Sequence, residues 1–196
     1  MFNNLGVSRE TFMRLKEYQK LLLKWNRAIN LVSKHDQQFL WDRHILDSLQ
    51  LIKFIDNLDI HLVDLGSGAG FPGMVLSIAG VKNVTLIESN VKKCSFLLYV
   101  SKLSQNNIKI LNQFITSRDI MFCDILTSRG YGSIQKILDT TRSFTIKYKI
   151  LLNKSKKCMD EILITKKTWQ FDYNIYQSLT SDSGNILEIE NISPLL

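Results

Sequence analysis

The sequence predicts an α/β fold in which a mostly parallel sheet is covered by helices on both faces. Short apolar runs alternate with helical segments through the middle of the chain, and this alternation is typical of a parallel sheet. Helical segments precede the first run, and two β-rich runs around a turn follow the last helix. With 196 residues, 45% of them hydrophobic and 22% charged, the chain is expected to form one globular structural domain.

Two amphipathic segments come first. Apolar residues recur at helical spacing over residues 8–25, where Ser8 is placed to cap the helix, and again over residues 36–55. Neither segment carries a strand signal. We therefore expect residues 1–60 to form a helical extension that packs as a cap on residues 61–196, within a single structural domain.

The remaining elements follow in alternation. The apolar runs predict strands at 61–66, 83–89, 107–113, 123–129 and 148–154. The segments between and after them predict helices at 72–80, 91–104, 133–142 and 158–168. The runs WQFDYNIYQSL and ILEIENI, on either side of SDSGN, predict a C-terminal antiparallel hairpin.

The stretch DLGSGAGFPG (64–73) lies where the first strand should turn into a helix. It contains four of the nine glycines of the chain. Glycine permits positive φ and lets a ligand approach the backbone where a Cβ would collide, and Pro72 suits the first turn of the following helix. The turn therefore has the chemistry of a nucleotide site.

Two acids bear on which cofactor such a site takes. The glycines at 68, 70 and 73 fit a dinucleotide pattern, and Glu88, at the end of the next strand, can accept hydrogen bonds from ribose hydroxyls of either NAD or S-adenosylmethionine. Asp64, by contrast, opposes a pyrophosphate and can face the ammonium and sulfonium groups of S-adenosylmethionine. The pattern favours the methyl donor, with a nicotinamide-dependent oxidoreductase as the alternative.

Other classes of protein find little support. No stretch approaches the roughly eighteen apolar residues of a membrane span, and the N-terminus lacks the pattern of a secretion signal, so we expect a cytoplasmic protein. Three distant cysteines and three histidines form no disulfide or metal-ligand pattern, and no metal is expected. The net charge of +7 is compatible with a polyanionic partner. One lysine cluster is expected to contact RNA phosphates, or else to be a solvated face: Lys147, Lys149, Lys154, Lys156 and Lys157.

Several segments together resemble one family. They are WNRAINLVS (25–33), RHILDSL (43–49), DLGSGAGFPG, ESNVKKCSFL (88–97) and TSRG (127–130). In order and spacing they resemble the bacterial small-subunit ribosomal RNA guanine-N7 methyltransferases, also called the glucose-inhibited division protein B family. The similarity covers nearly the whole chain.

The resemblance implies a fold and an activity. The fold is the Rossmann-like fold of class I methyltransferases, and the methyl donor is S-adenosylmethionine. The acceptor is N7 of a guanosine in the 530 loop of 16S rRNA, so the expected partner is 16S rRNA or the 30S subunit. We expect a monomer without membrane or metal partners. A non-catalytic RNA-binding or ribosome-assembly factor that retains the fold is a further alternative.

The resemblance also suggests site residues. Gly66 and Phe71 match cofactor-contacting positions of the glycine loop, to which Gly68 also belongs, and Asp64 and Glu88 complete the expected cofactor set. Arg129 matches a signature arginine that contacts bound ligand, so it is expected in both cofactor binding and catalysis. Two more cofactor positions match Ile115 and Thr116, and a late-strand lysine, the second expected catalytic residue, matches Lys154. The sequence departs from the family at Phe114, Ile115, Thr116, Gly130 and Ser155.

The expected chemistry requires little from the protein beyond alignment. Guanine N7 carries an in-plane lone pair and can attack a sulfonium methyl group without first losing a proton. No catalytic base is therefore needed, and positioning and electrostatic tuning are the expected contributions. His44, three and four residues before Asp47 and Ser48, is expected to lie in a helix contact rather than to build a site.

Overall fold

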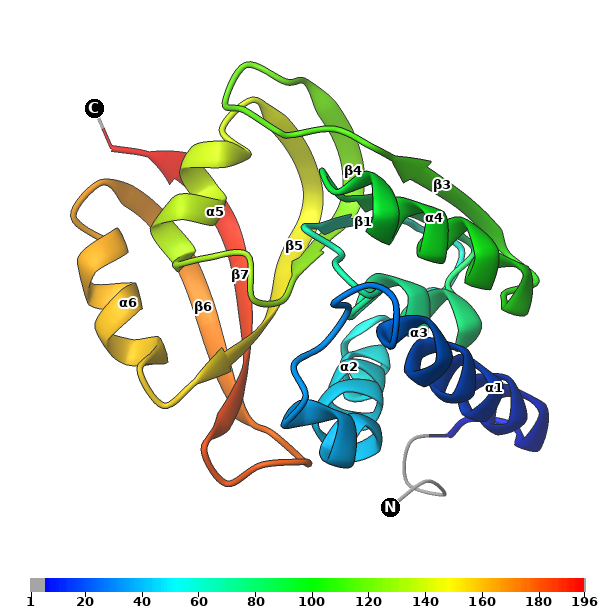
Figure 1. Cartoon of the computed structure of the whole chain (residues 1–196). Coiled ribbons are helices and arrows are strands. Elements are labelled where there is room, and N and C mark those ends of the chain that lie inside the picture. Colours follow the sequence, from blue (N-terminus) through cyan, green and yellow to red (C-terminus); the bar gives the residue numbers. More distant parts are fainter. Residues whose placement is uncertain (1–5, 196) are drawn as a thin grey trace.

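The computed structural model describes residues 6–195, which build a seven-stranded sheet in the order β3-β2-β1-β4-β5-β7-β6 (Figure 1). The five strands expected from the apolar runs are present and pair in parallel. Their ends differ from the predicted ends by a few residues, most at the start of the last one. The bounds are β1 His61–Leu65, β2 Asn83–Ile87, β3 Asn107–Leu111, β4 Met121–Ser128 and β5 Phe144–Ser155.

The predicted C-terminal hairpin is also confirmed. It consists of β6 (Trp169–Gln177) and β7 (Gly184–Pro194), which pair antiparallel. β7 lies between β5 and β6 and pairs antiparallel with β5 as well. The turn at 178–183 therefore lies at the same edge of the sheet as the carboxyl ends of the parallel strands.

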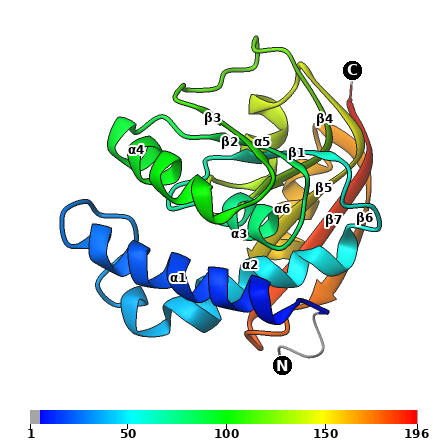
Figure 2. The same cartoon turned by 90° about the vertical axis from the view of Figure 1, so that its right-hand side faces the viewer.

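Helices cover both faces of the sheet, as the alternation predicts (Figures 1 and 2). One face carries α1 (Arg9–Asn26), α3 (Gly73–Ile78) and α4 (Val91–Val100), and the other carries α5 (Ile134–Thr140) and α6 (Cys158–Thr165). A short 3-10 turn, η5 (Ser101–Leu103), extends α4 over the predicted range. Pro72 lies one residue before α3, at its N-cap.

The N-terminal helix forms as its sequence pattern predicts. The Ser8 hydroxyl accepts a hydrogen bond from the Thr11 N–H at 3.1 Å and caps the first turn. Leu15, Tyr18 and Leu22 are fully buried on the face that meets the core. The prediction for α1 is therefore confirmed to within one residue at each end.

The second helical segment is irregular. It consists of a 3-10 turn η2 (Asp36–Phe39), a π-helical turn η3 (Trp41–Leu46), one α-helical turn α2 (Asp47–Leu49) and a 3-10 turn η4 (Gln50–Phe54). Buried apolar side chains keep three- and four-residue spacing from Ile45 and Leu46 to Leu49, but the step from Leu40 to Ile45, across the π-helical turn, is five residues. π-helical turns occur frequently at functional sites.

Two apolar clusters form the core, one on each face of the sheet. The first joins α1, the 36–55 segment, α3 and α4 to residues of β1 and β2 such as Leu62 and Leu86. The second joins α5 and α6 to the opposite face, including Val63 and Leu126. Residues of the N-terminal extension thus share a core with the sheet, and that packing fixes their place beside β1.

The sequence also predicts that the N-terminus carries no secretion signal and that no segment spans a membrane. The first of these predictions falls partly on residues 1–5, which lie outside the described residues. Among residues 6–195, no helix has the length and hydropathy required to cross a bilayer. Cys94, Cys123 and Cys158 are buried free thiols, and Trp169 is buried with its ring N–H donating to Asp139 at 2.9 Å.

Candidate active site

The candidate site lies where β1, β2 and β4 end. The strand order reverses between β1 and β4, and open α/β sheets bind ligands in the crevice beyond the carboxyl ends of strands at such a point. The glycine turn leaves β1 here, Glu88 follows β2, and Arg129 follows β4. The fold therefore brings together residues that are far apart in the sequence.

Backbone and carboxylate hydrogen bonds hold the glycine turn. The N–H groups of Gly66 and Ser67 both donate to the Ile87 carbonyl, at 3.0 and 2.9 Å. Glu88 accepts from the Gly68 N–H through Oε2 and from the Asn90 N–H through Oε1, each at 2.8 Å. The turn is thus tied to the end of β2 at two successive residues.

Two glycines are required by close approaches. Gly66 has φ 72°, and a Cβ there would lie 2.6 Å from the Tyr131 ring. Gly70 has φ 100°, and its Cβ would meet Met74 at 2.7 Å and the Tyr18 hydroxyl at 2.9 Å. Any side chain at either position would displace packed neighbours and strain the backbone.

Asp64 lies beneath the turn and is fully buried. Its Oδ2 accepts from the Gly73 N–H at 3.0 Å, which joins the end of β1 to the start of α3, while Oδ1 has no hydrogen-bond partner among the described residues. Burial, opposed by the hydrogen bond from the Gly73 N–H and aided by the nearby Glu88 charge, raises the pKa of this carboxyl to about 7. Protonated and ionised forms are therefore both populated near neutral pH.

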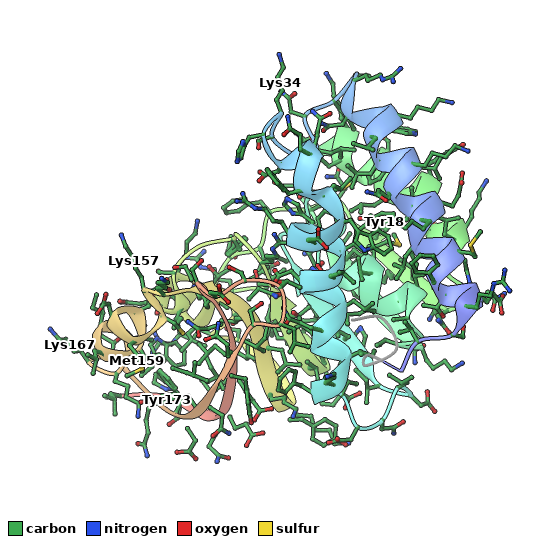
Figure 3. All side chains as sticks on the ribbon, turned by 90° about the horizontal axis from the view of Figure 1, so that it is seen from below. Tyr18, Lys34, Lys157, Met159, Lys167 and Tyr173 are labelled. Atoms are coloured by element: carbon green, nitrogen blue, oxygen red, sulfur yellow. The ribbon has the colours of Figure 1, made fainter. Side chains whose placement is uncertain are left out.

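Tyr18, on the buried face of α1, holds the turn from the other side. Its buried hydroxyl donates to the Ala69 carbonyl, and its ring packs edge-on against Phe71 at 5.8 Å between centroids. In Figure 3 Tyr18 lies in the interior beside α1. A tyrosine on a face otherwise formed by leucines is the signal that indicates such a buried hydroxyl partner.

A first cavity, of about 220 Å³, opens beside the turn. Its walls include Gly66, Glu88, Phe114, Ile115 and Tyr131. Ile115 is buried here, and Phe114 is largely exposed. The side chain and N–H of Thr116 instead donate to Asp119, at 2.8 and 2.7 Å, and Thr116 is not part of the cavity wall.

Arg129 lies at the end of β4 and is held by the 36–55 segment. Its Nη2 donates to the Arg43 carbonyl at 2.7 Å, its Nη1 lies 3.5 Å from the His44 carbonyl, and its Nε lies 3.5 Å from Asp47 Oδ2. Its guanidinium carbon lies 5.8 Å from the centre of the Phe71 ring. Burial lowers the pKa of Arg129, and Asp47 opposes this effect.

Asp47 is a second site residue that the sequence pattern did not single out. Its Oδ1 accepts from the Gln50 side chain at 2.7 Å and from the Thr180 hydroxyl at 3.0 Å. The 36–55 segment, the residue after β4 and the β6–β7 turn therefore meet at one carboxylate.

A second cavity, of about 720 Å³, adjoins the first at Gly130, which lines both. It is lined by polar and charged residues of segments 36–47, 129–130, 153–155 and 180–184. His44 lies in its wall and packs against Phe71 of the glycine turn with 5.1 Å between ring centroids, whereas the sequence predicted a helix contact away from any site. Burial and the Arg129 charge lower the pKa of His44 to about 4, so its imidazole is neutral near pH 7.

Lys154 also lines the second cavity. Its ammonium group donates to Glu161 Oε2 at 2.7 Å and to the Gly132 carbonyl at 3.0 Å, and only 8% of its side chain is exposed. Lys147 and Lys149 pair with Asp124 and Glu188, at 3.8 and 2.8 Å. The expected lysine cluster is thus not one free patch, because acids outside the cluster pair with three of its five members.

The first cavity suits a nucleoside. Leu65, Ile87 and Ile115 give it apolar walls against which a base can pack, and the Glu88 carboxylate can accept hydrogen bonds from ribose hydroxyls. The close contact between Gly66 and Tyr131 leaves no room for a Cβ on this wall. Within residues 6–195, no group of three histidines, cysteines or acids could hold a metal ion.

Comparison with known sequences decides the family. Residues 12–190 match the family described as rRNA small subunit methyltransferase G. The chain belongs to this family. The ribosomal RNA small subunit methyltransferases G of Rickettsia akari and Rickettsia prowazekii are 50% and 48% identical to it over 192 residues, or 98% of this chain and 100% of each relative. The family resemblance in the sequence is confirmed, and the protein is an S-adenosylmethionine-dependent methyltransferase.

Solved structures confirm the fold class. A ribosomal protein L11 methylase from Lactobacillus delbrueckii subsp. bulgaricus aligns with a TM-score of 0.56 at 12% identity, covering 74% of this chain and 76% of that one. A fibrillarin/Nop5p complex aligns with a TM-score of 0.54 at 13% identity, covering 76% and 81%. The Rossmann-like methyltransferase fold predicted from the sequence is the fold of this chain.

The pKa of Asp64 leads to a stability prediction. Because its folded-state pKa of about 7 exceeds the ordinary value of 3.8, its protonation stabilises the folded state at low pH, and this stabilisation is lost as pH rises toward 7. The expected loss is on the order of 4 kcal/mol. Asp64→Asn, which keeps an acceptor for the Gly73 N–H, should lack this loss.

Urea unfolding between pH 4 and pH 8 measures the difference. The free energy of unfolding of the wild type should fall relative to that of Asp64→Asn as pH rises, whereas Asp56→Asn, at an exposed acid, should follow the wild type. Parallel pH profiles for wild type and Asp64→Asn would contradict the assignment.

Proposed function

We propose that the protein transfers a methyl group from S-adenosylmethionine to N7 of a guanosine in the 530 loop of 16S rRNA. The observation that carries the proposal is the pair of cavities that meet at Gly130, one suited to a nucleoside and the other polar and open enough for a base. Membership of the family described as rRNA small subunit methyltransferase G supports ribosomal RNA as the acceptor. A methyl donor in the first cavity and an acceptor base in the second would meet beside Arg129.

For the cofactor we propose the residues around the first cavity. Glu88 would bind the ribose, Ile115 would pack against the adenine, and the backbone of Gly66 and Gly68 would allow close approach of the ligand. Phe71 and Asp64 would lie near the methionine end, where the Asp64 carboxylate favours a positive charge. Thr116 completes the proposed cofactor set, and its N–H and hydroxyl both donate to Asp119.

The chemistry fits a site without a general base. S-adenosylmethionine, held around the first cavity, would supply a sulfonium methyl group that the N7 lone pair of guanine could accept, with the sulfonium becoming a thioether and no proton being lost. The neutral imidazole of His44 places no additional cation beside the sulfonium charge. What the protein supplies is the alignment of acceptor and donor.

Arg129 and Lys154 are the proposed residues of the acceptor side. Arg129 is fixed by two carbonyls and by Asp47, so its guanidinium can orient a base without reorganising. Lys154 would contribute a buried ammonium group to the wall and would hold the turn after β4 through Gly132. Both residues reach the second cavity from strands of the sheet, which are rigid supports.

Further parts of the proposal concern the setting. We propose that residues 1–60 act as a helical cap which helps to build the acceptor cavity through residues 36–47. We also propose that the enzyme acts as a monomer in the cytoplasm, on 16S rRNA or the 30S subunit, without a metal ion. A non-catalytic assembly factor with the same fold is the competing proposal, and the Arg129 variants below bear on it as well.

Methyl transfer to 30S subunits that lack the modification tests the function. Radiolabel from S-adenosylmethionine should enter 16S rRNA, and chemical cleavage at 7-methylguanosine should place it in the 530 loop. Bound S-adenosylmethionine without any transfer to subunits or to 16S rRNA would favour the assembly factor. Transfer to another nucleotide would overturn the choice of acceptor.

Tyr18→Phe tests how the turn is held. The change removes only the hydroxyl that donates to the Ala69 carbonyl, so affinity for S-adenosylhomocysteine should fall about five-fold, the value of one net hydrogen bond. Titration calorimetry measures this, with Tyr99→Phe, at an exposed tyrosine of α4, as the matched control. Equal affinities for Tyr18→Phe and Tyr99→Phe would show that the hydroxyl does not position the turn.

Arg129→Ala should lower kcat by about ten-fold or more, because the guanidinium that orients the acceptor is lost. Arg129→Lys, which keeps the charge but not the planar fork, should recover only part of the rate. Single-turnover methyl transfer measures both, with thermal unfolding as a check on folding and Arg142→Ala as an exposed control. Activity of Arg129→Ala within a few-fold of wild type would remove Arg129 from the reaction.

A further inference from the structure

The loop after α1 belongs to the segment WNRAINLVS (25–33), which lines neither the first nor the second cavity. Asn26 fixes its shape: Oδ1 accepts from the N–H groups of Leu31 and Val32 at 2.7 and 2.9 Å, and Nδ2 donates to the Val32 carbonyl at 3.1 Å. Trp25 anchors the end of α1 against Phe96, with 5.7 Å between ring centroids. The loop is therefore held in one conformation.

This rigid loop surrounds a hollow of about 940 Å³, here called the N-terminal hollow. Its wall is formed by residues 26–27, 30–34 and 37. Arg27 and Lys34 supply two cations, Asn30 and Gln37 supply amides, and Leu31 and Val32 supply apolar surface, of which Leu31 is buried. Acidic side chains are absent from this wall.

The two cations are available to a ligand. Arg27 and Lys34 are exposed, and within residues 6–195 neither forms an ion pair. Arg43, by contrast, has Asp36 at 3.4 Å, and Lys154 has Glu161. In Figure 3 Lys34 projects outward from the N-terminal helical part, well away from Lys157 and Lys167 near α6.

The walls of the N-terminal hollow and the second cavity are neighbours. The Ser33 hydroxyl, in the wall of the hollow, donates to Asp36 Oδ2, in the wall of the cavity, at 2.6 Å. A chain that leaves the second cavity past Asp36 would therefore pass close to the hollow. Cations contact phosphates, amides read base edges and apolar surface packs against bases, so the wall of the hollow matches a single-stranded polynucleotide.

We propose that the N-terminal hollow binds the RNA nucleotides that flank the methylated base, with Arg27 and Lys34 on their phosphates. The inference rests on the proposed function, because it takes the second cavity as the acceptor site. The site serves substrate binding alone, since Arg27 and Lys34 lie outside both cavities where cofactor and acceptor meet. A protein of the 30S particle that rests on the hollow instead is the alternative that the experiment separates.

The experiment compares two charge-matched double variants. Arg27→Ala/Lys34→Ala removes the cations of the hollow. Arg142→Ala/Lys167→Ala removes one exposed arginine and one exposed lysine just before β5 and β6, which run parallel to each other. Those positions lie at the amino ends of the strands, at the edge of the sheet opposite the candidate active site.

Three quantities are measured for each protein: affinity for S-adenosylhomocysteine, KM and kcat with protein-free 16S rRNA and with 30S subunits, and the dependence of RNA affinity on salt. The hollow variant should bind S-adenosylhomocysteine normally and keep its kcat, while its KM for the substrate rises about ten-fold. The slope of log affinity against log salt should become less steep by about 1.4, the value for two contacts to single-stranded phosphates. The control should match the wild type throughout.

The outcomes are distinct. If the wild type methylates no ribosomal RNA, the proposed function fails. If the wild type is active and the two double variants behave alike, only the hollow is overturned. If the wild type is active and the hollow variant shows a raised KM with 30S subunits but an unchanged affinity for protein-free RNA, the hollow contacts a ribosomal protein. The assignment to RNA is then wrong.

Discussion

The hydrogen bond from the Gly73 N–H to Asp64 fixes the geometry on which the site depends. It joins Asp64, near the end of β1, to Gly73, the first residue of α3. The chain between these two residues must therefore form a compact loop above the carboxylate. That loop lies where Glu88 and Tyr18 can hold it from β2 and from α1. A buried carboxyl with one unpartnered oxygen is costly, and such costs are commonly retained at functional sites.

A second constraint joins the two halves of the site. Arg129 comes from the sheet, yet the carbonyls of Arg43 and His44 and the carboxylate of Asp47 hold it, all from an irregular helical segment before β1. The π-helical turn over Trp41–Leu46 contains both of these carbonyls, and the His44 carbonyl also accepts from the Asp47 N–H and the Ser48 hydroxyl. The helical cap is thus part of the site wall, and the position of the arginine depends on how that cap packs on the sheet.

Much of this architecture could be predicted from the sequence, because apolar periodicity and glycine chemistry are local signals. They located five parallel strands, the terminal hairpin, α1 with its Ser8 cap, and the glycine turn with Asp64 and Glu88 around it. These local signals do not predict which distant parts of the chain pair with one another. The insertion of β7 beside β5, the bond from Tyr18 to Ala69 and the pairing of Lys149 with Glu188 depend on which elements become neighbours, which no local pattern encodes. Thr116 is a local case instead, because its hydroxyl donates to an acid only three residues later.

The place of β7 has a consequence for how substrate choice can change. β7 runs back between β5 and β6. The hairpin turn, residues 178–183, therefore lies at the second cavity and contributes Thr180 and Ser181 to its wall. This turn shares no residue with the wall of the first cavity. A surface turn tolerates changes in length and sequence better than a strand does. With the donor in the first cavity and the acceptor in the second, as proposed above, this turn could change to fit other acceptors while the wall of the donor cavity stays the same.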